Sequence, residues 1–405
     1  MRPARPRSCI EIAAGLGVLT AAASGVRAQR PTVQCEPIGP ILRGHGLGAT
    51  LAPGSGENRS LASPAQRRVG FGFAGKVFHT PVLRAVPGLR LTTIVQRHGA
   101  PDPRYPDVDF VPSVDELLSR PLDVVVVATP NTSHHPIAKQ CLSAGRHVVV
   151  DKPFTTTLAE ARELVELARE ARRVLSVYQE RRYTGDFVTT QNVVSDGVLG
   201  RIVSYEAHFD RFRPEPRPGA WREQPLPGSG VWFDLGPHLF DQAVLLFGLP
   251  QAISADIRIE RDGAQADDAC DVALHYPRMR AVLRASMLRA PMAPSFAVHG
   301  TKGSFIKYGL DPQEAALKDG HTPDEPHWDV EPPELHGKLT TPEGTRTIPT
   351  TPSSFTRYYE NVRDAILGKA QLAVTPEHAL NVMRGLELAV ASSRQRCVLP
   401  WSAAV

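Results

Sequence analysis

The chain has 405 residues, of which 42% are hydrophobic and 22% charged, with a formal net charge of +4. This length and composition favour a soluble globular protein with two domains of substantial core, and they exclude a disordered chain. Because the net charge is slight and no long basic run occurs, we expect no nucleic-acid partner. The five cysteines are far apart and without paired spacing, which indicates ordinary thiols in a reducing compartment, with neither disulfide framework nor zinc site.

Residues 1–66 differ in character from the rest of the chain. A mildly apolar run from Ile12 to Ala23 follows three arginines, and the segment from Gln29 to Gln66 is rich in Pro, Gly, Ser and Arg. The apolar run is too short and too weak for a membrane helix. Three interpretations stay open: an export signal, a flexible extension, or sequence upstream of a misassigned start codon. We favour the second or third and treat residues 1–66 as a disordered or signal-like leader.

Glycines follow one another in G-x-G-x-x-G order at Gly70, Gly72 and Gly75. A short β-like run, Arg68-Val69, enters this loop and a helix-compatible run, Val77 to Val86, leaves it. The first glycine permits a tight turn, the second lets the backbone approach a pyrophosphate, and the third lets the helix pack closely on the strand. We therefore predict a dinucleotide site here, with Phe73 and Ala74 part of its loop.

The next β-like run, Leu89 to Val95, ends at Gln96-Arg97-His98. At this place an Asp or Glu would bind the ribose 2′-hydroxyl of NAD, and neither is present. Arg97 can face a 2′-phosphate instead, so the sequence favours NADP over NAD, with NAD still possible. The alternative interpretation of Arg97 is a solvated surface arginine.

Helical and β-like runs then alternate, as a parallel sheet requires. We expect helices over Ser113–Leu118, His134–Ala144 and Thr157–Arg172, and strands over Asp123–Ala128, His147–Val150 and Val174–Tyr178. Ligands bind beyond the carboxyl ends of such strands, and those ends carry Thr129, Pro130 and Asn131 after one strand and Asp151 and Lys152 after the next. A lysine at a strand tip points to function, although a plain surface lysine remains the alternative.

The second half of the chain has a different pattern. A helix is expected over Thr184–Ser195 and a long strand over Ile202–Phe212, followed by the proline-rich segment Arg213–Pro227, which carries Trp221. If Pro237 begins a helix, His238 and Asp241 lie one turn apart and Asp234 lies just ahead of the N-terminus. Asp234 and His238 can transfer protons to or from a substrate hydroxyl, or they can be a cap and a structural histidine.

Short alternating runs between residues 252 and 308 predict an open, mostly antiparallel sheet. The Pro-rich stretch His321–Pro352 is expected to be an irregular excursion, and helices are expected over Phe355–Leu367 and Pro376–Arg394. The histidines in this half have no metal-ligand spacing, so we expect no metal site. The predicted organisation is a leader (1–66), a dinucleotide-binding domain (67–180), an α+β substrate and oligomerisation domain (181–375), and a C-terminal helix and tail (376–405).

Three motifs together resemble the Gfo/Idh/MocA oxidoreductase family: the loop from Gly70 to His79, Ala128-Thr129-Pro130-Asn131, and Asp151-Lys152-Pro153-Phe154. The resemblance covers the chain from about residue 67 onward and is strongest to NADP-dependent scyllo-inositol dehydrogenase-like members. It departs from the usual E-K-P motif, because Asp151 replaces the Glu and shortens its reach. The implied fold is α/β, with a Rossmann doubly wound parallel sheet followed by an α+β domain with a large open sheet.

The resemblance also implies an activity. Asp234 and His238 match the family's Asp-x-x-x-His pair, which acts with the motif lysine, here Lys152. The substrate would be a sugar, inositol or related polyol, whose pocket Arg181, Tyr183 and Trp221 could line, and the protein would be a homodimer or homotetramer associated through the open sheet. We hypothesise that His238 is the acid/base, that Lys152 hydrogen-bonds the reacting oxygen and lowers the pKa of His238, and that Asp234 orients a neighbouring hydroxyl.

Two other functions remain open. Some family members are ligand-sensing regulators that keep the nucleotide site, and others reduce an aromatic diol or a linear tetrapyrrole. The presence of all three motif residues favours an enzyme over a regulator. Since a soluble nicotinamide cofactor is available in the cytoplasm, we expect a cytoplasmic protein with no membrane partner.

Overall fold

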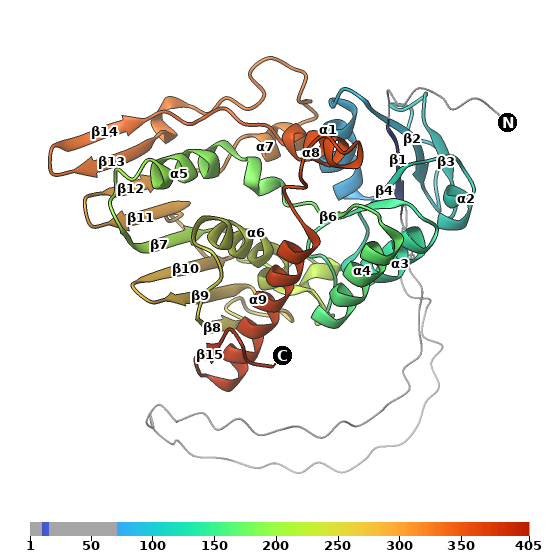
Figure 1. The fold of residues 1–405 in the computed structure, drawn as a ribbon. Helices are drawn as coiled ribbons and strands as arrows, with labels where there is room; N and C mark the ends of the chain where they lie inside the picture. The colour runs from blue at the N-terminus through green and yellow to red at the C-terminus, as the bar shows by residue number, and fades with distance from the viewer. Residues whose placement is uncertain (1–9, 16–70, 405) are drawn as a thin grey trace, which may run out of the picture. The chain divides into compact units, whose positions relative to one another are not determined.

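The computed structural model describes residues 10–15 and 71–404. In this part of the chain the first sheet has six parallel strands in the order β3-β2-β1-β4-β5-β6 (Figure 1). The strands are β1 (Ile10–Gly15), β2 (Leu89–Val95), β3 (Asp109–Val111), β4 (Val124–Val127), β5 (His147–Val150) and β6 (Leu175–Val177). The order 3-2-1-4-5-6 is that of the doubly wound dinucleotide-binding sheet, which confirms the expected fold class.

Helices cover both faces of this sheet, as its sequence requires. All four valines of β4 are buried, because a strand in the middle of a doubly covered sheet meets side chains on both faces. The helices are η1 (Gly75–His79), α1 (Thr80–Arg84), α2 (Val114–Leu118), η2 (Asn131–Ser133), α3 (His134–Ser143) and α4 (Leu158–Ala171). Ser113 caps α2 and Thr157 forms a capping box with Glu160 at the start of α4, so both helices begin where side-chain oxygens satisfy backbone N–H groups.

The central strand β1 lies near the N-terminus of the chain, in a part of the sequence for which no strand was predicted. Ile10–Gly15, which the sequence analysis assigned to the leader, pairs in parallel with β2 on one side and with β4 on the other. Its sequence, Ile-Glu-Ile-Ala-Ala-Gly, is too short to predict a strand by itself, and the strand is defined by its pairing with β2 and β4. The predicted strand Arg68-Val69, and Gly70 with it, lie outside the described residues.

The second sheet has nine strands in the described chain and carries the order β14-β13-β12-β11-β7-β10-β9-β8-β15. Its strands are β7 (Ile202–His208), β8 (Ala252–Arg258), β9 (Ala269–Tyr276), β10 (Met279–Ser286), β11 (Phe296–Gly300), β12 (Ser304–Lys307), β13 (Gly337–Thr341), β14 (Gly344–Ile348) and β15 (Leu399–Pro400). The pairing is antiparallel except between β7 and β10, which run parallel. The expected open, mostly antiparallel sheet is therefore confirmed.

One expectation about this sheet was wrong. The stretch 321–352 is not wholly irregular, because it contains the hairpin β13–β14 at the sheet edge. β13 pairs with the exposed edge of β12, and Gly337 lies against the ring of Phe305, where a Cβ would come within 2.3 Å of the ring. Strand β12 thus offers its backbone N–H and C=O groups for pairing with β13, which the Pro-rich composition of the segment does not predict.

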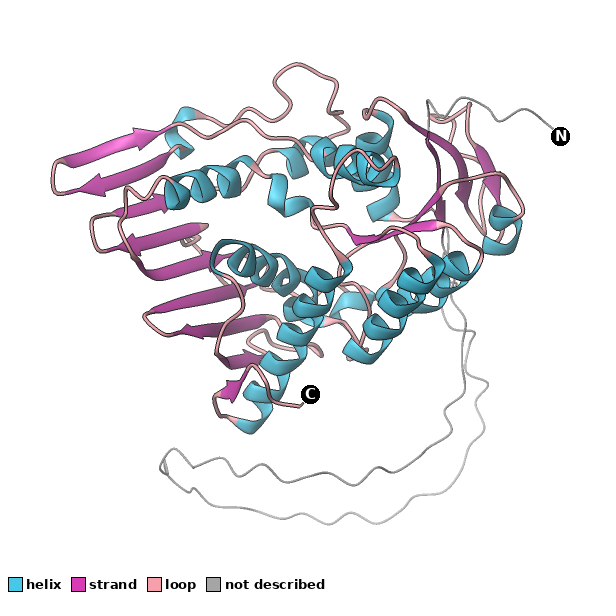
Figure 2. Ribbon diagram, in the orientation of Figure 1, coloured by secondary structure: helices cyan, strands magenta, loops and turns pink. Residues whose placement is uncertain are grey.

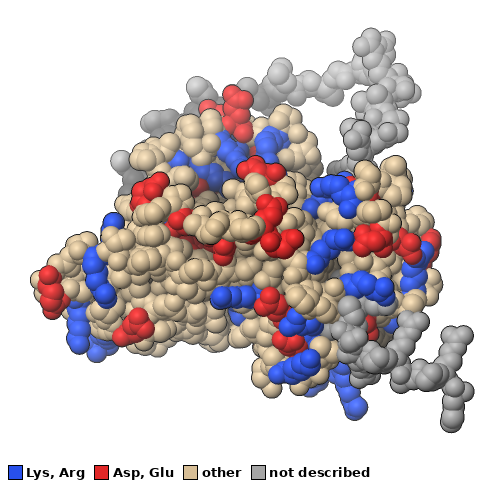
Figure 3. Space-filling model, turned by 90° about the horizontal axis from the view of Figure 1, so that it is seen from above, with Lys and Arg blue, Asp and Glu red and all other residues tan. Residues whose placement is uncertain are grey.

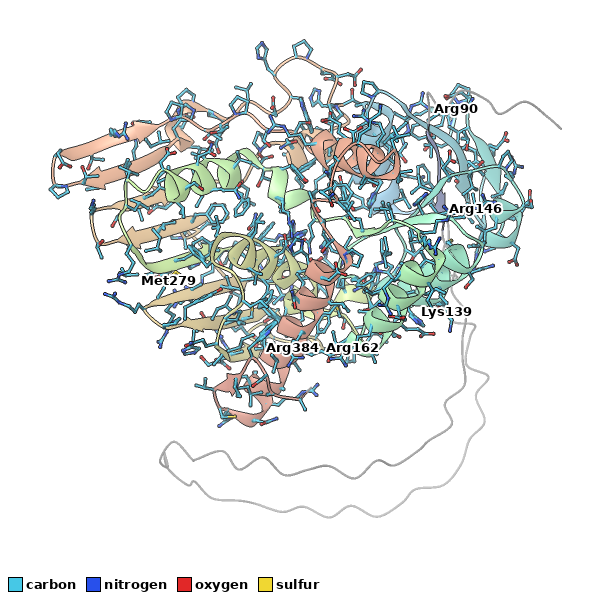
Figure 4. All side chains as sticks on the ribbon, in the orientation of Figure 1. Arg90, Lys139, Arg146, Arg162, Met279 and Arg384 are labelled. Atoms are coloured by element: carbon cyan, nitrogen blue, oxygen red, sulfur yellow. The ribbon has the colours of Figure 1, made fainter. Side chains whose placement is uncertain are left out.

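The remaining helices follow the first sheet along the chain, and the first two of them connect it to the second sheet. They are η3 (Glu180–Tyr183), α5 (Gly185–Ser195), η4 (Trp221–Glu223), α6 (Gly230–Phe247), α7 (Gln313–Lys318), η5 (Pro333–Leu335), α8 (Thr356–Ile366) and α9 (Pro376–Gln395). α6 and α9 pack against one another and against strands of the second sheet, and α9 also contacts β6 and α4 (Figure 2). Arg384 on α9 donates to the carbonyls of Trp401 and Ala403, which ties the C-terminal segment to the helix (Figure 4).

The surface carries mixed charge. Lysine and arginine alternate with aspartate and glutamate over the face shown in Figure 3, with no continuous basic area on that face. Among the described residues, no helix combines the length and apolar character needed to cross a bilayer.

Candidate active site

Three loops follow the carboxyl ends of adjacent strands in the parallel sheet. Thr129–Asn131 follows β4, Asp151 and Lys152 follow β5, and Glu180 follows β6. The carboxyl ends of parallel strands meet at one edge of the sheet, which is where doubly wound folds bind their ligands. The candidate site is built at this edge, against helix α6 of the second part of the chain.

Lys152 is held by a single residue of α6. Its Nζ donates to the backbone oxygen of Asp234 at 2.7 Å and to Asp234 Oδ1 at 3.0 Å. The Lys152 side chain is 14% exposed and that of Asp234 is 20% exposed. The two residues that the family motifs singled out are therefore in direct contact, although 82 positions separate them in the chain.

Asp234 is surrounded by positive charge. Besides Lys152, the Nε of Arg222 lies 3.3 Å from Oδ1 and the Nη1 of Arg211 lies 3.9 Å from Oδ2. Burial alone would raise the pKa of Asp234, but the three cations together hold that pKa well below its ordinary value. Asp234 is thus a permanent carboxylate, which can accept hydrogen bonds but cannot hold a proton near neutral pH.

His238 lies one turn after Asp234 on α6 and is only 4% exposed. Burial, and after it the charges of Lys152 and Arg181, lower the pKa of His238 well below its ordinary value. The predicted effect of Lys152 on this histidine has the expected direction, with burial as the larger cause. Nδ1 of His238 is buried and has no hydrogen-bond partner among the described residues, so this ring nitrogen is available to a bound substrate.

The local geometry of α6 differs from the prediction in one respect. Pro237 does not begin the helix: α6 starts at Gly230, and Pro237 lies inside it. Asp234 is consequently not ahead of the helix but one turn before His238 on the same face, at i and i+4. Asp241, which was grouped with His238, accepts two hydrogen bonds of 2.6 Å from the buried guanidinium of Arg182 and is committed to that ion pair.

Two buried histidines, His79 and His134, contact the loop after β5. Asp151 Oδ1 accepts the N–H of Lys152 at 2.8 Å, and His79 Nε2 lies 3.8 Å from the same oxygen. His134 places one ring nitrogen 2.8 Å from the carbonyl of Pro153 and the other 2.9 Å from that of Thr129. Asp151 therefore orients the backbone before Lys152, and His134 links the loops after β4 and β5.

The predicted cofactor residues lie in separate segments near this edge. Gly72, Phe73, Ala74 and Gly75 lead into η1, and the N–H of Lys76 bonds the carbonyl of Gly72 at 3.0 Å. A Cβ on Gly75 would come within 3.3 Å of the Phe71 ring, so a glycine suits this close packing. Gly70 lies outside the described residues. These features fit a dinucleotide, whose phosphates bind where backbone N–H groups open a helix.

The other cofactor candidates occupy the loops after β2 and β4. Arg97 lies half-buried in the loop that follows β2, the position where a ribose is bound in this fold. Thr129 and Pro130 precede η2, and the side-chain amide of Asn131 donates to the carbonyl of Gly228 at 2.6 Å. Asn131 thereby connects the nucleotide-binding part to the segment just before α6.

The predicted substrate residues do not all reach the site. Arg181 lies 4.8 Å from the centre of the Phe209 ring and pairs with Glu314. Trp221 lies 4.5 Å beneath the guanidinium of Arg222, which in turn contacts Asp234. Tyr183 instead packs beside the ring of Tyr358 and is partly buried in the hydrophobic core.

Glu180 is a member of the site that sequence reasoning missed. Its Oε1 lies 3.7 Å from His238 Nε2, and its Oε2 is buried without a hydrogen-bond partner in the described chain. Burial raises the pKa of Glu180 to about 7, against the opposing charges of Arg181 and Lys152. The signal that could have found it is its position at the tip of β6, equivalent to that of Lys152 after β5. Arg211 and Arg222 were also missed, because no motif marked them.

No group of metal-ligating side chains occurs within residues 10–15 and 71–404. The arrangement offers a neutral histidine, a charged lysine donor and a permanent carboxylate beside a dinucleotide-type loop. A fold and site of this kind define a nucleotide-dependent oxidoreductase class.

Comparison with known protein families also indicates an oxidoreductase. Residues 68–179 match the oxidoreductase family's NAD-binding Rossmann fold, and residues 192–400 match the oxidoreductase family's C-terminal alpha/beta domain. The chain belongs to the Gfo/Idh/MocA oxidoreductase family. Strand β1 lies upstream of the matched region.

The chain is similar to its relatives over most of its length. It is 43% identical to the uncharacterized oxidoreductase YdgJ of Escherichia coli over 82% of this chain and 96% of that protein. It is 36% identical to the scyllo-inositol 2-dehydrogenase (NADP(+)) IolW of Bacillus subtilis over 81% of this chain and 93% of that protein. A crystal structure of an oxidoreductase from Bacillus cereus is similar with a TM-score of 0.75 and 34% identity, covering 83% of this chain and 98% of that one.

Proposed function

We propose that the protein is an NADP-preferring dehydrogenase or reductase that acts on a secondary hydroxyl of a sugar, inositol or related polyol. The observation that carries this proposal is the contact of Lys152 Nζ with Asp234, one helical turn from His238, at the ligand-binding edge of a dinucleotide-type sheet. IolW is named for scyllo-inositol and NADP(+), and another relative is named 1,5-anhydro-D-fructose reductase. These names support a polyol or sugar substrate and a nicotinamide cofactor.

The cofactor would be held by the loop Gly72–Gly75 at its phosphates and by the loops after β4 and β5 nearer the reacting end. The nicotinamide, when bound, supplies the hydride chemistry. Arg97, in place of an acidic residue after β2, supports a preference for the 2′-phosphate of NADP. Guanidinium groups bind phosphate through several N–H donors, which gives this preference its physical basis.

His238, Lys152 and Asp234 have separate roles in the proposed reaction. His238 is neutral because of its lowered pKa, so it accepts the hydroxyl proton during oxidation and returns a proton during reduction. Lys152 donates a hydrogen bond to the reacting oxygen, where negative charge develops. Asp234 remains a carboxylate and accepts a hydrogen bond from a neighbouring substrate hydroxyl, which selects the substrate orientation.

Substrate hydroxyls would also meet the arginines around Asp234. Arg222 has a side chain 39% exposed and lies over Trp221, so it can donate to a bound polyol while the indole supplies an apolar wall. Trp221 and Arg181 remain the proposed pocket residues. We further propose a cytoplasmic homodimer or homotetramer that associates through the face of the nine-stranded sheet.

The test is a fluorescence titration of the purified full chain with NADPH and, separately, with NADH. We expect NADPH to bind more tightly, and Arg97→Ala to weaken NADPH binding by about tenfold or more while NADH binding stays the same. Arg120→Ala is the matched control, because Arg120 is, like Arg97, a half-buried arginine, and it pairs with Asp109. A reversed preference would remove Arg97 from the site, and binding of neither nucleotide would refute the proposed function.

A screen of inositols and aldoses with the preferred nucleotide then tests turnover. Loss of turnover in His238→Ala with unchanged nucleotide binding supports its acid/base role. Tight nucleotide binding without turnover of any substrate would favour a ligand-sensing regulator.

A further inference from the structure

The proton taken up by His238 needs a route out of the site. His238 is 4% exposed, and burial together with Lys152 and Arg181 disfavours its charged form. An imidazolium formed during alcohol oxidation is therefore a high-energy species in this position. The reaction is faster if a nearby base removes the proton as soon as it arrives.

Three carboxyl groups lie close enough to be considered, and two of them are poor proton acceptors. Asp234 contacts three cations, and Asp151 is buried near His79 and Lys152. In both cases the neighbouring charges outweigh burial and hold the pKa of the carboxyl well below its ordinary value. A carboxylate of this kind does not take a proton from an imidazole at neutral pH.

Glu180 differs from both in its electrostatic surroundings, which raise its pKa instead of lowering it, and it lies close to His238. Its Oε1 is 3.7 Å from His238 Nε2, a separation that a small side-chain movement or one water molecule closes. Its side chain is 14% exposed, compared with 4% for His238, so it lies nearer to solvent. Its Oε2 is buried and makes no hydrogen bond to any described residue, which leaves an oxygen able to carry a proton.

We propose that Glu180 relays the proton between His238 and solvent water. The proposal rests on the proposed dehydrogenase function. In oxidation the substrate hydroxyl gives its proton to His238, and the imidazole releases a proton to Glu180 and ends neutral. The Glu180 carboxylate becomes a carboxylic acid and then gives that proton to water. The carbinol carbon would lose its hydrogen as a hydride to the oxidised nicotinamide and become a carbonyl carbon. Reduction runs the same relay in reverse.

The surroundings of Glu180 suit a group that titrates during turnover. Burial raises its pKa to about 7, close to the pH at which such a relay must both accept and release a proton. Charged and titratable groups face it from every neighbouring segment: Lys152 and Asp151 after β5, Tyr178 at the end of β6, Arg181 in η3, His238 on α6, and Tyr358 and Tyr359 on α8.

A structural alternative is that Glu180 only neutralises Arg181. The Nε of Arg181 lies 3.9 Å from Glu180 Oε1, which is longer than a hydrogen bond. Arg181 already pairs with Glu314, and its guanidinium also lies over the Phe209 ring. Arg181 therefore contributes charge but no hydrogen bond to Glu180, and the 3.7 Å separation of His238 Nε2 from the same oxygen is likewise longer than a hydrogen bond. The unpartnered Oε2 and the proximity of His238 Nε2 favour a relay over a purely structural ion pair.

The decisive variant is Glu180→Gln, which keeps size and shape but cannot exchange a proton. With a polyol substrate and saturating nucleotide, we expect wild-type kcat to rise with pH around a midpoint near 7. In Glu180→Gln this rise should disappear and kcat at pH 8 should fall by about tenfold or more, with KM changed less than about twofold. Small buffer bases such as imidazole should restore part of the lost kcat in proportion to their concentration.

Two further variants separate a relay from a structural role. Glu180→Asp keeps a titratable carboxyl and should retain the pH-dependent rise, with a shifted midpoint. Glu314→Gln is the matched control, because it also removes a carboxylate from Arg181 but is not in contact with His238. It should leave the shape of the pH profile unchanged and give no buffer rescue.

A measurement without turnover checks the titration itself. Infrared pH-difference spectra of the full chain should contain a carboxyl band with a midpoint near 7 that is absent from Glu180→Gln. The comparison must be made between the two proteins, since burial beside Asp186 also raises the pKa of Asp311 to about 7. Identical infrared titrations, or a Glu180→Gln profile that superimposes on the wild type, would overturn the relay while leaving the proposed function intact. A wild type that turns over no polyol would refute the proposed function, and the relay with it.

Discussion

Lys152 influences the candidate site through its charge as well as its hydrogen bonds. It donates twice to Asp234, and its charge is, after burial, the largest influence that lowers the pKa of His238. Together with the neighbouring arginines at Asp234 and with burial at His238, this ammonium group favours an ionised Asp234 and a neutral His238, which are the two protonation states that the proposed chemistry needs.

Replacing Lys152 with Met should therefore have two separate effects. We expect kcat/KM to fall by about 100-fold or more, because a hydrogen-bond donor to the developing negative charge is lost. The pKa of His238 should move upward, since a neighbouring positive charge is removed, and NMR titration of its ring protons would measure this. Lys139→Met is the control, because Lys139 lies on α3 and pairs with Glu163 (Figure 4). An unchanged His238 titration would contradict the assigned electrostatics.

Glu180 also makes a prediction about stability. Its pKa is raised from an ordinary value of 4.5 to about 7 in the folded protein. The folded state therefore binds this proton more tightly than the unfolded state, and the stability that it contributes is present below about pH 4.5 and is lost as the pH rises through about 7. Glu180→Gln should be more stable than wild type at pH 8 by about 3 kcal/mol and nearly equal to wild type in stability at pH 4.5. Urea unfolding at the two pH values measures the difference, and equal stabilities at pH 8 would contradict the raised pKa.

At the scale of elements, the contact between α6 and α9 positions the site. α6 carries both Asp234 and His238, and Gly385 of α9 faces the ring of Phe240 so closely that a Cβ would come within 2.3 Å of it. α6 also holds Gly236 against the ring of Trp232, whose indole N–H bonds the carbonyl of Leu386. Small residues thus let the two helices approach closely enough to hold the catalytic candidates in place.

Gly385→Ala should destabilise the protein, against the usual trend for helices. In an exposed helix this change is stabilising by about 1 kcal/mol. Here the added methyl group overlaps the ring of Phe240, so we expect a loss of about 2 kcal/mol or more in the free energy of unfolding. Urea denaturation gives this value, and kcat should fall as well because α6 must shift. A variant as stable as the wild type would show that the helices can separate without cost.

At the scale of the whole molecule, the C-terminal helices return to the nucleotide-binding part. Tyr358 on α8 donates to Ser176 Oγ in β6 at 2.9 Å, and Ser176 donates to the carbonyl of Val374. Glu387 on α9 accepts the backbone N–H of Leu158 at 2.6 Å, at the start of α4. The predicted separate segment 376–405 therefore packs on both parts of the chain.

We expect these contacts to make unfolding cooperative. Calorimetry should give one main transition for the two sheets, and NADPH at about 100 times its dissociation constant should stabilise the protein by about 2.7 kcal/mol. Both sheets should unfold at the raised temperature, because the nucleotide-binding part and the substrate part share α8 and α9. Two transitions, of which NADPH moves only one, would contradict this coupling.

The amino-acid sequence by itself determined the elements whose residues are locally consistent. β2 and β5 have the predicted bounds, because both are rich in β-branched and apolar residues, which favour a strand, even though β2 also contains the exposed Arg90. Lys152, Asp234 and His238 were also singled out from the sequence, through the family resemblance. The structure places Lys152 against Asp234 and His238 one turn further along the same helix, while their catalytic roles stay a prediction.

The tertiary structure was needed to identify β1, β13 and β14 and three residues of the candidate site. β1 and the hairpin β13–β14 are strands because neighbouring strands pair with them, which composition cannot show. No sequence motif marks Glu180. Its pKa is raised by burial, in a position beside His238, which lies 58 residues further along the chain. Arg211 and Arg222 likewise acquire their roles from Asp234, which the fold of α6 brings to them. Burial and long-range charge depend on which segments meet in space, and that information is absent from any local pattern.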